Sequence, residues 1–161
     1  MNLAKLFELQ ENLDKRIKKQ HGLESESLLS KKVLALQVEL AELANETRCF
    51  KFWSDKKPSN KQAILEEYVD CLHFILTLGL EKNFTDIVIE HRDVNYDMTA
   101  QFLNLYIDVN DFVVCYSKDH YLTLFEDFLS LGKSLGFSFS EIEEAYYDKN
   151  SVNHKRQDEG Y

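Results

Sequence analysis

Proline and glycine are scarce in this chain of 161 residues, which contains one Pro and five Gly. Folds built from many short strands need these residues in their tight turns, so their scarcity argues against such a fold and favours long helices. The three cysteines are odd in number, and no two of them have a Cys-x-x-Cys spacing. The chain therefore suggests neither a disulfide framework nor a zinc site, and we expect Cys71, in an apolar run, to be buried.

Long apolar runs are also missing. No stretch reaches the roughly 18 apolar residues that a membrane span needs, and the N-terminal segment has no uninterrupted apolar core of the kind found in signal peptides. We therefore expect a cytoplasmic protein that does not enter a membrane.

Positive charge is in deficit, with a formal net charge of -9. Such an acidic surface disfavours non-specific binding to nucleic acid or to anionic membranes. A nucleotide can still bind where metal ions or a local basic cluster neutralise its phosphates. The chain has such a cluster near its end, at Lys149, Lys155 and Arg156.

Hydrophobic residues make up 44% of the chain, enough for one packed domain over residues 1–161. Their spacing predicts an all-α helical bundle. The predicted helices span 3–19, 27–49, 59/60–79, 97–117, 119–135 and 140–150. Residues 80–91 could form a further short helix.

Some local signals support or oppose these helices. Gly79 is a plausible helix end, and Ser140 with Glu143 forms a capping-box pattern. The β-branched and aromatic residues of 106–116 oppose the helix predicted there. On composition alone, residues 151–161 would be a disordered tail.

The most informative feature is a pair of acidic patterns, Glu39-x-x-Glu42 and Glu67-x-x-Asp70, on consecutive predicted helices. Residues three apart on a helix share a face, so each pair projects two carboxylates in one direction. Both pairs interrupt apolar stripes, and buried carboxylates are costly unless they are paired or bind a metal. If the helices pack antiparallel, four carboxylates meet, and Mg²⁺ or Mn²⁺ suits such oxygen ligands.

The alternative for either pair is a solvated helix face, which is common for a single Glu-x-x-Glu. Glu46 lies near the face of Glu39 and could join a metal site. Glu66 is one position away from the second face, and we expect it to be solvated.

The two acidic motifs, separated by 24 residues, resemble those of the all-α NTP pyrophosphohydrolases, which include MazG-like proteins, dCTPases and dimeric dUTPases. Four segments narrow the resemblance to the dimeric dUTPases. They are the first-motif segment 6–17, the Trp-containing segment 45–57, the second acidic helix 66–80 and the C-terminal segment 145–161. The first motif of the family often has Asn where this chain has Asp14, which leaves the role of Asp14 open.

The resemblance implies Mg²⁺-dependent hydrolysis of dUTP, and also of dUDP, to dUMP by a homodimer. It implies that Glu39, Glu42, Glu67 and Asp70 hold the metal, and that Glu39 or Glu42 orients or deprotonates the attacking water. The rival enzymatic reading is a pyrophosphohydrolase of dCTP or of a non-standard NTP. A further rival is a non-catalytic helical regulator with acidic binding faces.

The resemblance also assigns the nucleotide contacts. The C-terminal segment 146–161 would bind phosphates and become ordered with the ligand, through Lys149, Asn153, Arg156 and Tyr161. The alternative is an ordinary charged terminus. The residues that it implies for contacts with the base or sugar are Gln10, Trp53, His73 and Asn150. Packing roles are the alternatives for Gln10, Trp53 and His73.

Overall fold

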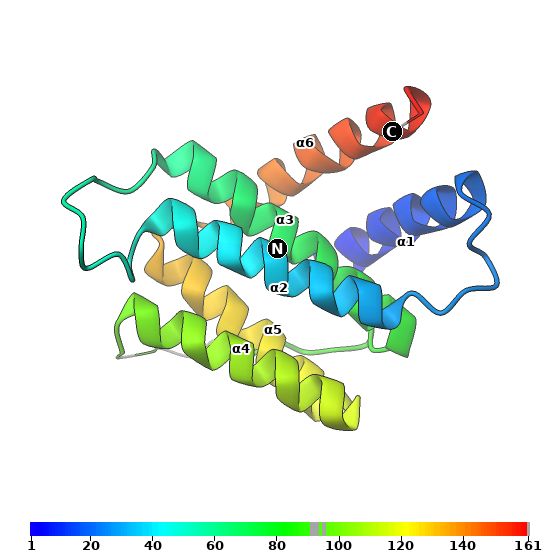
Figure 1. The fold of residues 1–161 in the computed structure, drawn as a ribbon. Coiled ribbons are helices and arrows are strands. Elements are labelled where there is room, and N and C mark those ends of the chain that lie inside the picture. Colours follow the sequence, from blue (N-terminus) through cyan, green and yellow to red (C-terminus); the bar gives the residue numbers. More distant parts are fainter. Residues whose placement is uncertain (91–93, 95, 161) are drawn as a thin grey trace.

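The computed structural model describes residues 1–90, 94 and 96–160, and this part of the chain consists of helices and connecting segments without strands (Figure 1). The helices are α1 (Leu3–Gln20), α2 (Leu29–Thr47), α3 (Lys61–Lys82), α4 (Met98–Cys115), α5 (Lys118–Ser134) and α6 (Phe139–Asp158). The all-α prediction is confirmed. Among the described residues, no helix is both long and apolar enough to cross a bilayer.

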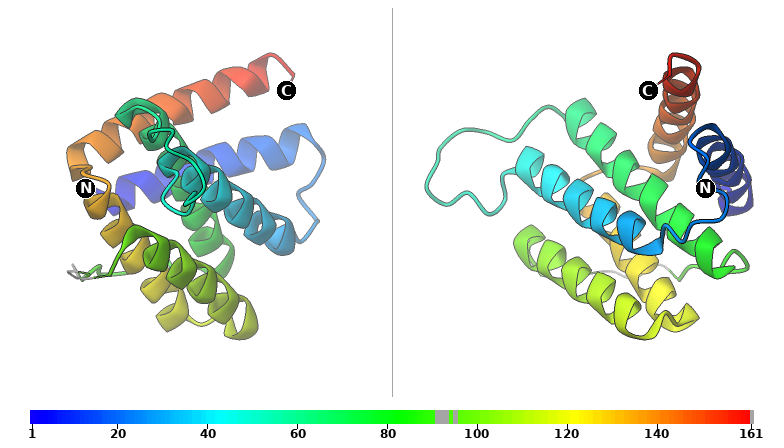
Figure 2. Two further views of the ribbon diagram at one scale, coloured as in Figure 1. Left: turned by 60° about the vertical axis from the view of Figure 1, so that its left-hand side comes forward. Right: turned by 45° about the vertical axis from the view of Figure 1, so that its right-hand side comes forward.

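Helix α3 lies at the centre of the bundle and packs against α1, α2, α5 and α6. It runs antiparallel to α2, while α4 pairs with α5 and also touches α2 (Figure 1). Helices α1 and α6 lie next to each other on a different side of α3 from α4 and α5 (Figure 2). The two acidic helices are therefore neighbours, and the C-terminal helix lies against one of them.

Two buried tyrosines join α3 to α5 reciprocally. The Tyr68 hydroxyl donates to the Phe128 carbonyl at 3.1 Å, and the Tyr121 hydroxyl donates to the Ile75 carbonyl at 3.0 Å. Each hydroxyl occupies the space that a Cβ would need at a glycine four residues beyond the accepting carbonyl, Gly132 or Gly79.

Gly79 therefore lies within α3, where the absence of a side chain leaves room for the Tyr121 hydroxyl. The prediction that it ends the helix was wrong. The helix continues to Lys82 and ends at Asn83, which adopts the left-handed conformation at φ 58°. The short helix predicted over 80–91 was also wrong beyond this point, because residues 84–90 are not helical. His91 of that range lies outside the described residues.

Helix α6 begins with a capping box, but Ser138 and Glu141 form it instead of the predicted Ser140 and Glu143. The sequence contains both overlapping patterns. The Glu141 carboxylate also pairs with Lys61 at the start of α3, at 2.5 Å, and this tertiary contact favours the earlier start.

Helix α6 extends to Asp158, so the prediction of a helix ending near residue 150 and of a disordered tail was wrong. Its last turns are held against α1. The Gln20 side chain donates to the Gln157 carbonyl at 2.7 Å, and Arg16 pairs with Asp158. These contacts join residues far apart in the sequence, which composition does not reveal.

The helices predicted over 97–117 and 119–135 are confirmed as α4 and α5. In α4, Leu105, Val109 and Phe112 are buried at helical spacing, and this burial outweighs the β propensity of the segment. Helix α2 is shorter than the predicted 27–49, because Arg48 adopts a left-handed conformation at φ 57° and ends it.

Candidate active site

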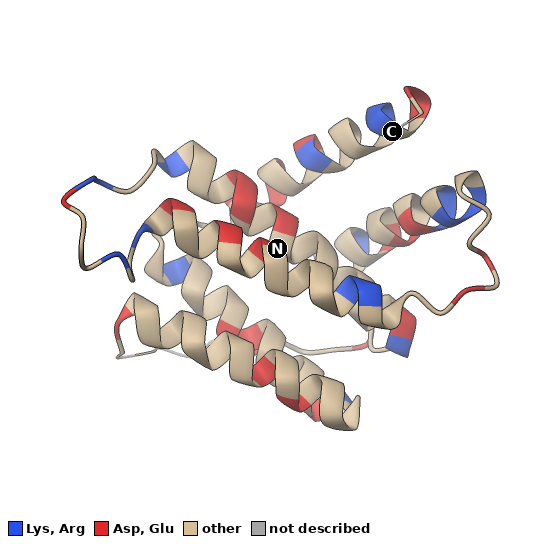
Figure 3. Cartoon of the chain, in the orientation of Figure 1, with Lys and Arg blue, Asp and Glu red and all other residues tan. Residues whose placement is uncertain are grey.

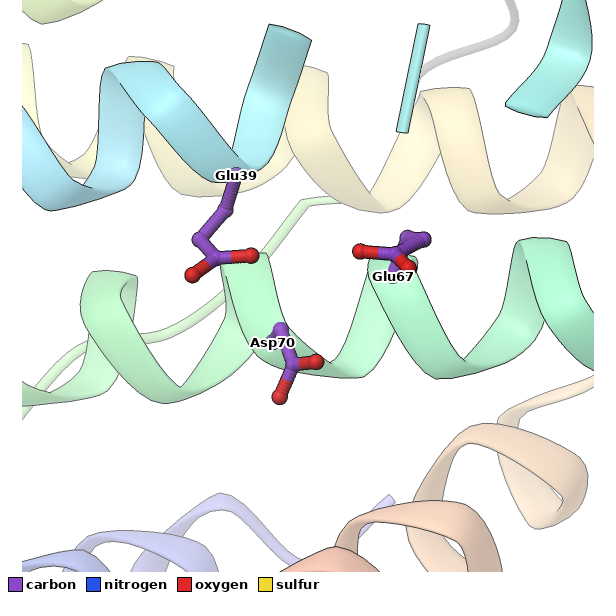
Figure 4. Close-up of side chains that lie close together, drawn as sticks. All are labelled: Glu39, Glu67 and Asp70. Carbon is purple, nitrogen blue, oxygen red and sulfur yellow. The ribbon is translucent and has the colours of Figure 1, made fainter. Parts of the chain in front are cut away.

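Three of the four predicted carboxylates converge between α2 and α3. One oxygen from each of Glu39, Glu67 and Asp70 lies within 4.8 Å of the others. Glu39 extends from α2 toward the two side chains of α3 (Figure 4), and acidic residues mark the neighbouring stretches of both helices (Figure 3). Helices α2 and α3 do pack antiparallel, which was the condition for their carboxylates to meet.

The cluster resists full ionisation. Burial, followed by the charges of Asp70, Glu42 and Glu67, raises the pKa of Glu39 to about 7. Burial also raises the pKa of Glu67 and of Asp70, although the Lys149 ammonium opposes both shifts. A raised pKa means that a carboxylate lacks sufficient positive charge nearby, so the cluster suits a hard divalent cation.

Glu42 lies at the edge of the cluster. Its side chain is exposed and is not one of the three that converge. Its charge nevertheless raises the pKa of Glu39 and Glu67, which shows that it is close to both. Glu46 contributes in the same way to Glu67, whereas Glu66 is exposed as predicted.

A pocket of about 460 Å³ opens beside the cluster, between α1, α2, α3 and α6. Glu39 and Asp70 form part of its wall. Its other polar and charged lining residues are Gln10, Asp14, Lys18, Lys32, His73, Thr77, Lys149, Asn153 and Arg156. A larger hollow of about 560 Å³ lies along α1, but none of the three converging carboxylates lines it.

Lys149, Asn153 and Arg156 line this pocket from one face of α6, where their spacing of four and three residues places them in a row. The Lys149 ammonium lies 2.5 Å from an Asp70 carboxylate oxygen, so it supplies positive charge to the acidic cluster. The fourth predicted phosphate ligand, Tyr161, lies outside the described residues.

Of the four residues predicted to contact the base or sugar, only two line the pocket. Gln10 and His73 are buried and line the pocket. Asn150 is buried, but it is not part of the lining. Trp53 lies in the loop between α2 and α3, is 63% exposed, and is not brought to the pocket in a single chain.

Lys32 and Thr77 are among the polar and charged pocket residues that sequence reasoning missed. The Lys32 ammonium is 2.6 Å from the Thr77 hydroxyl and 2.9 Å from an Asp14 carboxylate oxygen. A signal was present in both cases. Lys32 precedes the buried Leu36 by four residues on α2, and Thr77 follows His73 by four on α3, so each lies on a face that points inward.

Comparison with known proteins identifies a family. A family model described as dUTPase matches residues 2–161, which is nearly the whole chain. A search of curated proteins found no match.

Proposed function

The chain belongs to the dUTPase family, in its all-helical dimeric type, and from this premise we propose that it hydrolyses dUTP to dUMP and pyrophosphate with a divalent cation. The observation that carries the proposal is the convergence of Glu39, Glu67 and Asp70 beside a pocket lined by basic residues. The whole chain acts as one catalytic domain, in which residues 146–161 serve as the phosphate-binding segment.

Glu39, Glu67 and Asp70, with Glu42 beside them, would hold Mg²⁺ or Mn²⁺. The fit rests on their three converging oxygens and on the raised pKa of each of the three carboxylates. When bound, such a cation neutralises charge on phosphate oxygens and lowers the pKa of water. A carboxylate of α2, Glu39 or Glu42, orients the water and accepts its proton.

The row on α6 binds the phosphates. Arg156 offers a planar fork of donors, Lys149 a compact charge and Asn153 an amide. With substrate bound, Lys149 would turn from Asp70 to the phosphate oxygens, and Tyr161 would add a further contact. Because these contacts need only two phosphate groups, dUDP is also a substrate.

The nucleoside occupies the part of the pocket lined by Gln10 and His73, near the buried Asn150. A contact between Trp53 and the base would need either movement of the loop over residues 48–60 or a second copy of the chain, since Trp53 lies outside the pocket of its own chain.

The test is release of pyrophosphate or phosphate from a panel of dUTP, dUDP and the four standard dNTPs, with Mg²⁺, with Mn²⁺ and with EDTA. We expect turnover of dUTP and dUDP that EDTA abolishes and added Mg²⁺ restores. Preferential turnover of dCTP would contradict the proposed base specificity. Absence of turnover with any nucleotide would favour the alternative that the protein is a non-catalytic helical regulator.

We further propose that the protein is a homodimer formed through an apolar face on α2, α4 and the loop between α2 and α3. Large apolar side chains are exposed there. They are Leu34, Val38, Phe50, Phe52, Trp53, Leu103 and Ile107. An apolar groove of about 330 Å³ lies within this face, and such a surface is typical of an interface between copies.

Leu103→Asp is expected to dissociate the dimer. Leu103 is 62% exposed and lines the groove in this face, and a two-fold interface would meet the new charge twice. We expect a rise in the dimer dissociation constant of about 10²-fold or more, measured by sedimentation velocity. Val88→Asp is the control, because Val88 is 81% exposed, lies between α3 and α4, and does not line the groove. A Leu103→Asp variant that stays dimeric would exclude this interface.

A further inference from the structure

A continuous chain of polar contacts connects α2 to the pocket wall. The Lys32 ammonium lies 2.9 Å from Asp14 Oδ2, to which the Thr77 hydroxyl also donates. The Gln10 amide donates through Nε2 to Asp14 Oδ1 at 2.8 Å, and Gln10 Oε1 lies 2.7 Å from Nδ1 of His73. Every link involves a buried or partly buried side chain, so each link constrains the next.

These hydrogen bonds run in a defined direction, which is set at Asp14. An ionised carboxylate only accepts hydrogen bonds, and Lys32 and Thr77 both donate to this one. Gln10 must therefore turn its NH₂ group toward Asp14 and its carbonyl oxygen toward His73. Because that oxygen can only accept, Nδ1 of His73 carries the proton and Nε2 carries the lone pair.

Other contacts hold His73 in this form. Its ring stacks on Tyr146 with centroids 4.3 Å apart, and the Tyr146 hydroxyl donates to the same Gln10 oxygen at 2.9 Å. Burial, then the charge of Lys149, lowers the pKa of His73 to about 3. The ring is therefore neutral at ordinary pH, and its tautomer is the variable that the polar chain controls.

Nε2 of His73 is buried and has no hydrogen-bond partner within residues 1–90, 94 and 96–160. A buried acceptor in this condition is unfavourable until a donor reaches it. His73 is only 6% exposed and lines the pocket, as does Lys149 with its flexible side chain. When phosphates draw Lys149 away, a nucleoside can reach this acceptor.

We infer that Asp14, held by Lys32 and Thr77, is a positioning residue that acts through Gln10 to present His73 Nε2 as a hydrogen-bond acceptor for a donor of the nucleoside. The inference rests on the proposed function. Uracil has such a donor at N3–H, where cytosine has a lone pair that would face the lone pair of Nε2. The 3′-hydroxyl is the other donor of a deoxyuridine nucleotide.

Asp14→Asn is expected to reverse the donor–acceptor direction of the hydrogen bonds from residue 14 to His73. The oxygen of the substituted side chain would face the Lys32 ammonium, and its NH₂ group would then face Gln10. Gln10 would turn over, Nδ1 of His73 would accept from its NH₂ group, and the proton would move to Nε2. Tyr146 can follow, because its hydroxyl lies 3.4 Å from the Leu6 carbonyl as an alternative acceptor. Lys32 keeps its 2.6 Å ion pair with Glu81, so the fold is retained.

The first measurement is the ¹⁵N spectrum of the His73 ring in the full chain without nucleotide. We expect protonated-type Nδ1 and unprotonated-type Nε2 in the parent, and exchanged positions in Asp14→Asn. Gln10→Met, which removes the hydrogen bonds between Asp14 and His73, should abolish the preference for either tautomer. Lys18→Gln is the matched control, since Lys18 also pairs with Glu81, at 2.7 Å. An unchanged tautomer in Asp14→Asn would overturn the inference, whatever the activity.

The second measurement is binding of dUMP, dCMP and 2′,3′-dideoxyuridine monophosphate to parent and Asp14→Asn. If N3–H is the donor, the preference for dUMP over dCMP falls about tenfold or more. If the 3′-hydroxyl is the donor, the preference for dUMP over the dideoxy analogue falls instead. No change in either preference would exclude a nucleoside contact at Nε2. A failure of the proposed function would appear separately, as a parent protein that does not hydrolyse dUTP.

Discussion

Glu39→Gln should abolish hydrolysis of dUTP while making the metal-free protein more stable. Glu39 is the carboxylate of α2 that meets Glu67 and Asp70, so its loss removes a ligand from the proposed cation site. Loss of several kcal/mol of charge stabilisation in the transition state corresponds to about 10³-fold in turnover. Removal of one negative charge from the cluster relieves repulsion, so the melting temperature in EDTA should rise by a few degrees.

The gain in stability should depend on pH in a defined direction. The pKa of Glu39 is about 7 in the folded protein, against an ordinary value of 4.5. Ionisation therefore opposes folding, and the parent loses stability relative to Glu39→Gln as pH rises from about 4.5 to about 7. Below this window the two proteins should be similar, and above it the difference should be constant.

The measurements are pyrophosphate release with Mg²⁺ and thermal unfolding in EDTA across this pH range. Glu24→Gln is the control, because Glu24 is exposed and its charge is not among those that shift the pKa of Glu39, Glu67 or Asp70, and it should change neither quantity. A Glu39→Gln variant with parental turnover would refute the metal site. Parental activity would also remove the main support for catalysis by this cluster.

Arg156→Ala should lower kcat/KM for dUTP by about 10–100-fold with little change in stability. Arg156 lines the pocket from α6 and is exposed. Its charge already reaches Asp70, where it partly offsets the rise in pKa that burial causes. Loss of charge-assisted hydrogen bonds to phosphate accounts for the expected magnitude. Substitutions at exposed positions usually change stability by less than about 0.5 kcal/mol.

Lys155→Ala is the matched control for this experiment. Lys155 is the adjacent exposed cation on α6, but it does not line the pocket. Steady-state kinetics and circular dichroism of both variants separate a loss of phosphate binding from a loss of helix. Equal effects of the two substitutions would indicate a general effect of charge near the chain end, and would contradict a specific role for Arg156.

The positions of the helices and the inward direction of the acidic residues could be predicted from the sequence. A helix repeats every 3.6 residues, so the spacing of apolar residues identifies its buried face without knowledge of its partners. The same rule placed Glu39 on an inward face of one helix, and Glu67 with Asp70 on an inward face of the next. The family resemblance, and not this spacing, singled out Gln10 and His73, which both line the pocket.

Helix boundaries depended on contacts between distant segments. Gly79 does not end α3, because the Tyr121 hydroxyl from α5 fills the space beside it. Two overlapping capping boxes were possible at the start of α6, and the pairing of Glu141 with Lys61 accompanies the one that forms. The last turns of α6 are helical because α1 supplies partners for them.

The local pattern of this sequence determined which side chains share a face and which of those faces are apolar. Only the tertiary structure decided which faces meet and how far apart their atoms lie. That is why Glu42 remained at the edge of the cluster and Trp53 outside the pocket. The tertiary structure also decided which groups contact Asp14, whose role the sequence left open. Its partners Lys32 and Thr77 lie 18 and 63 residues away along the chain, and packing alone brings such distant groups within hydrogen-bonding distance.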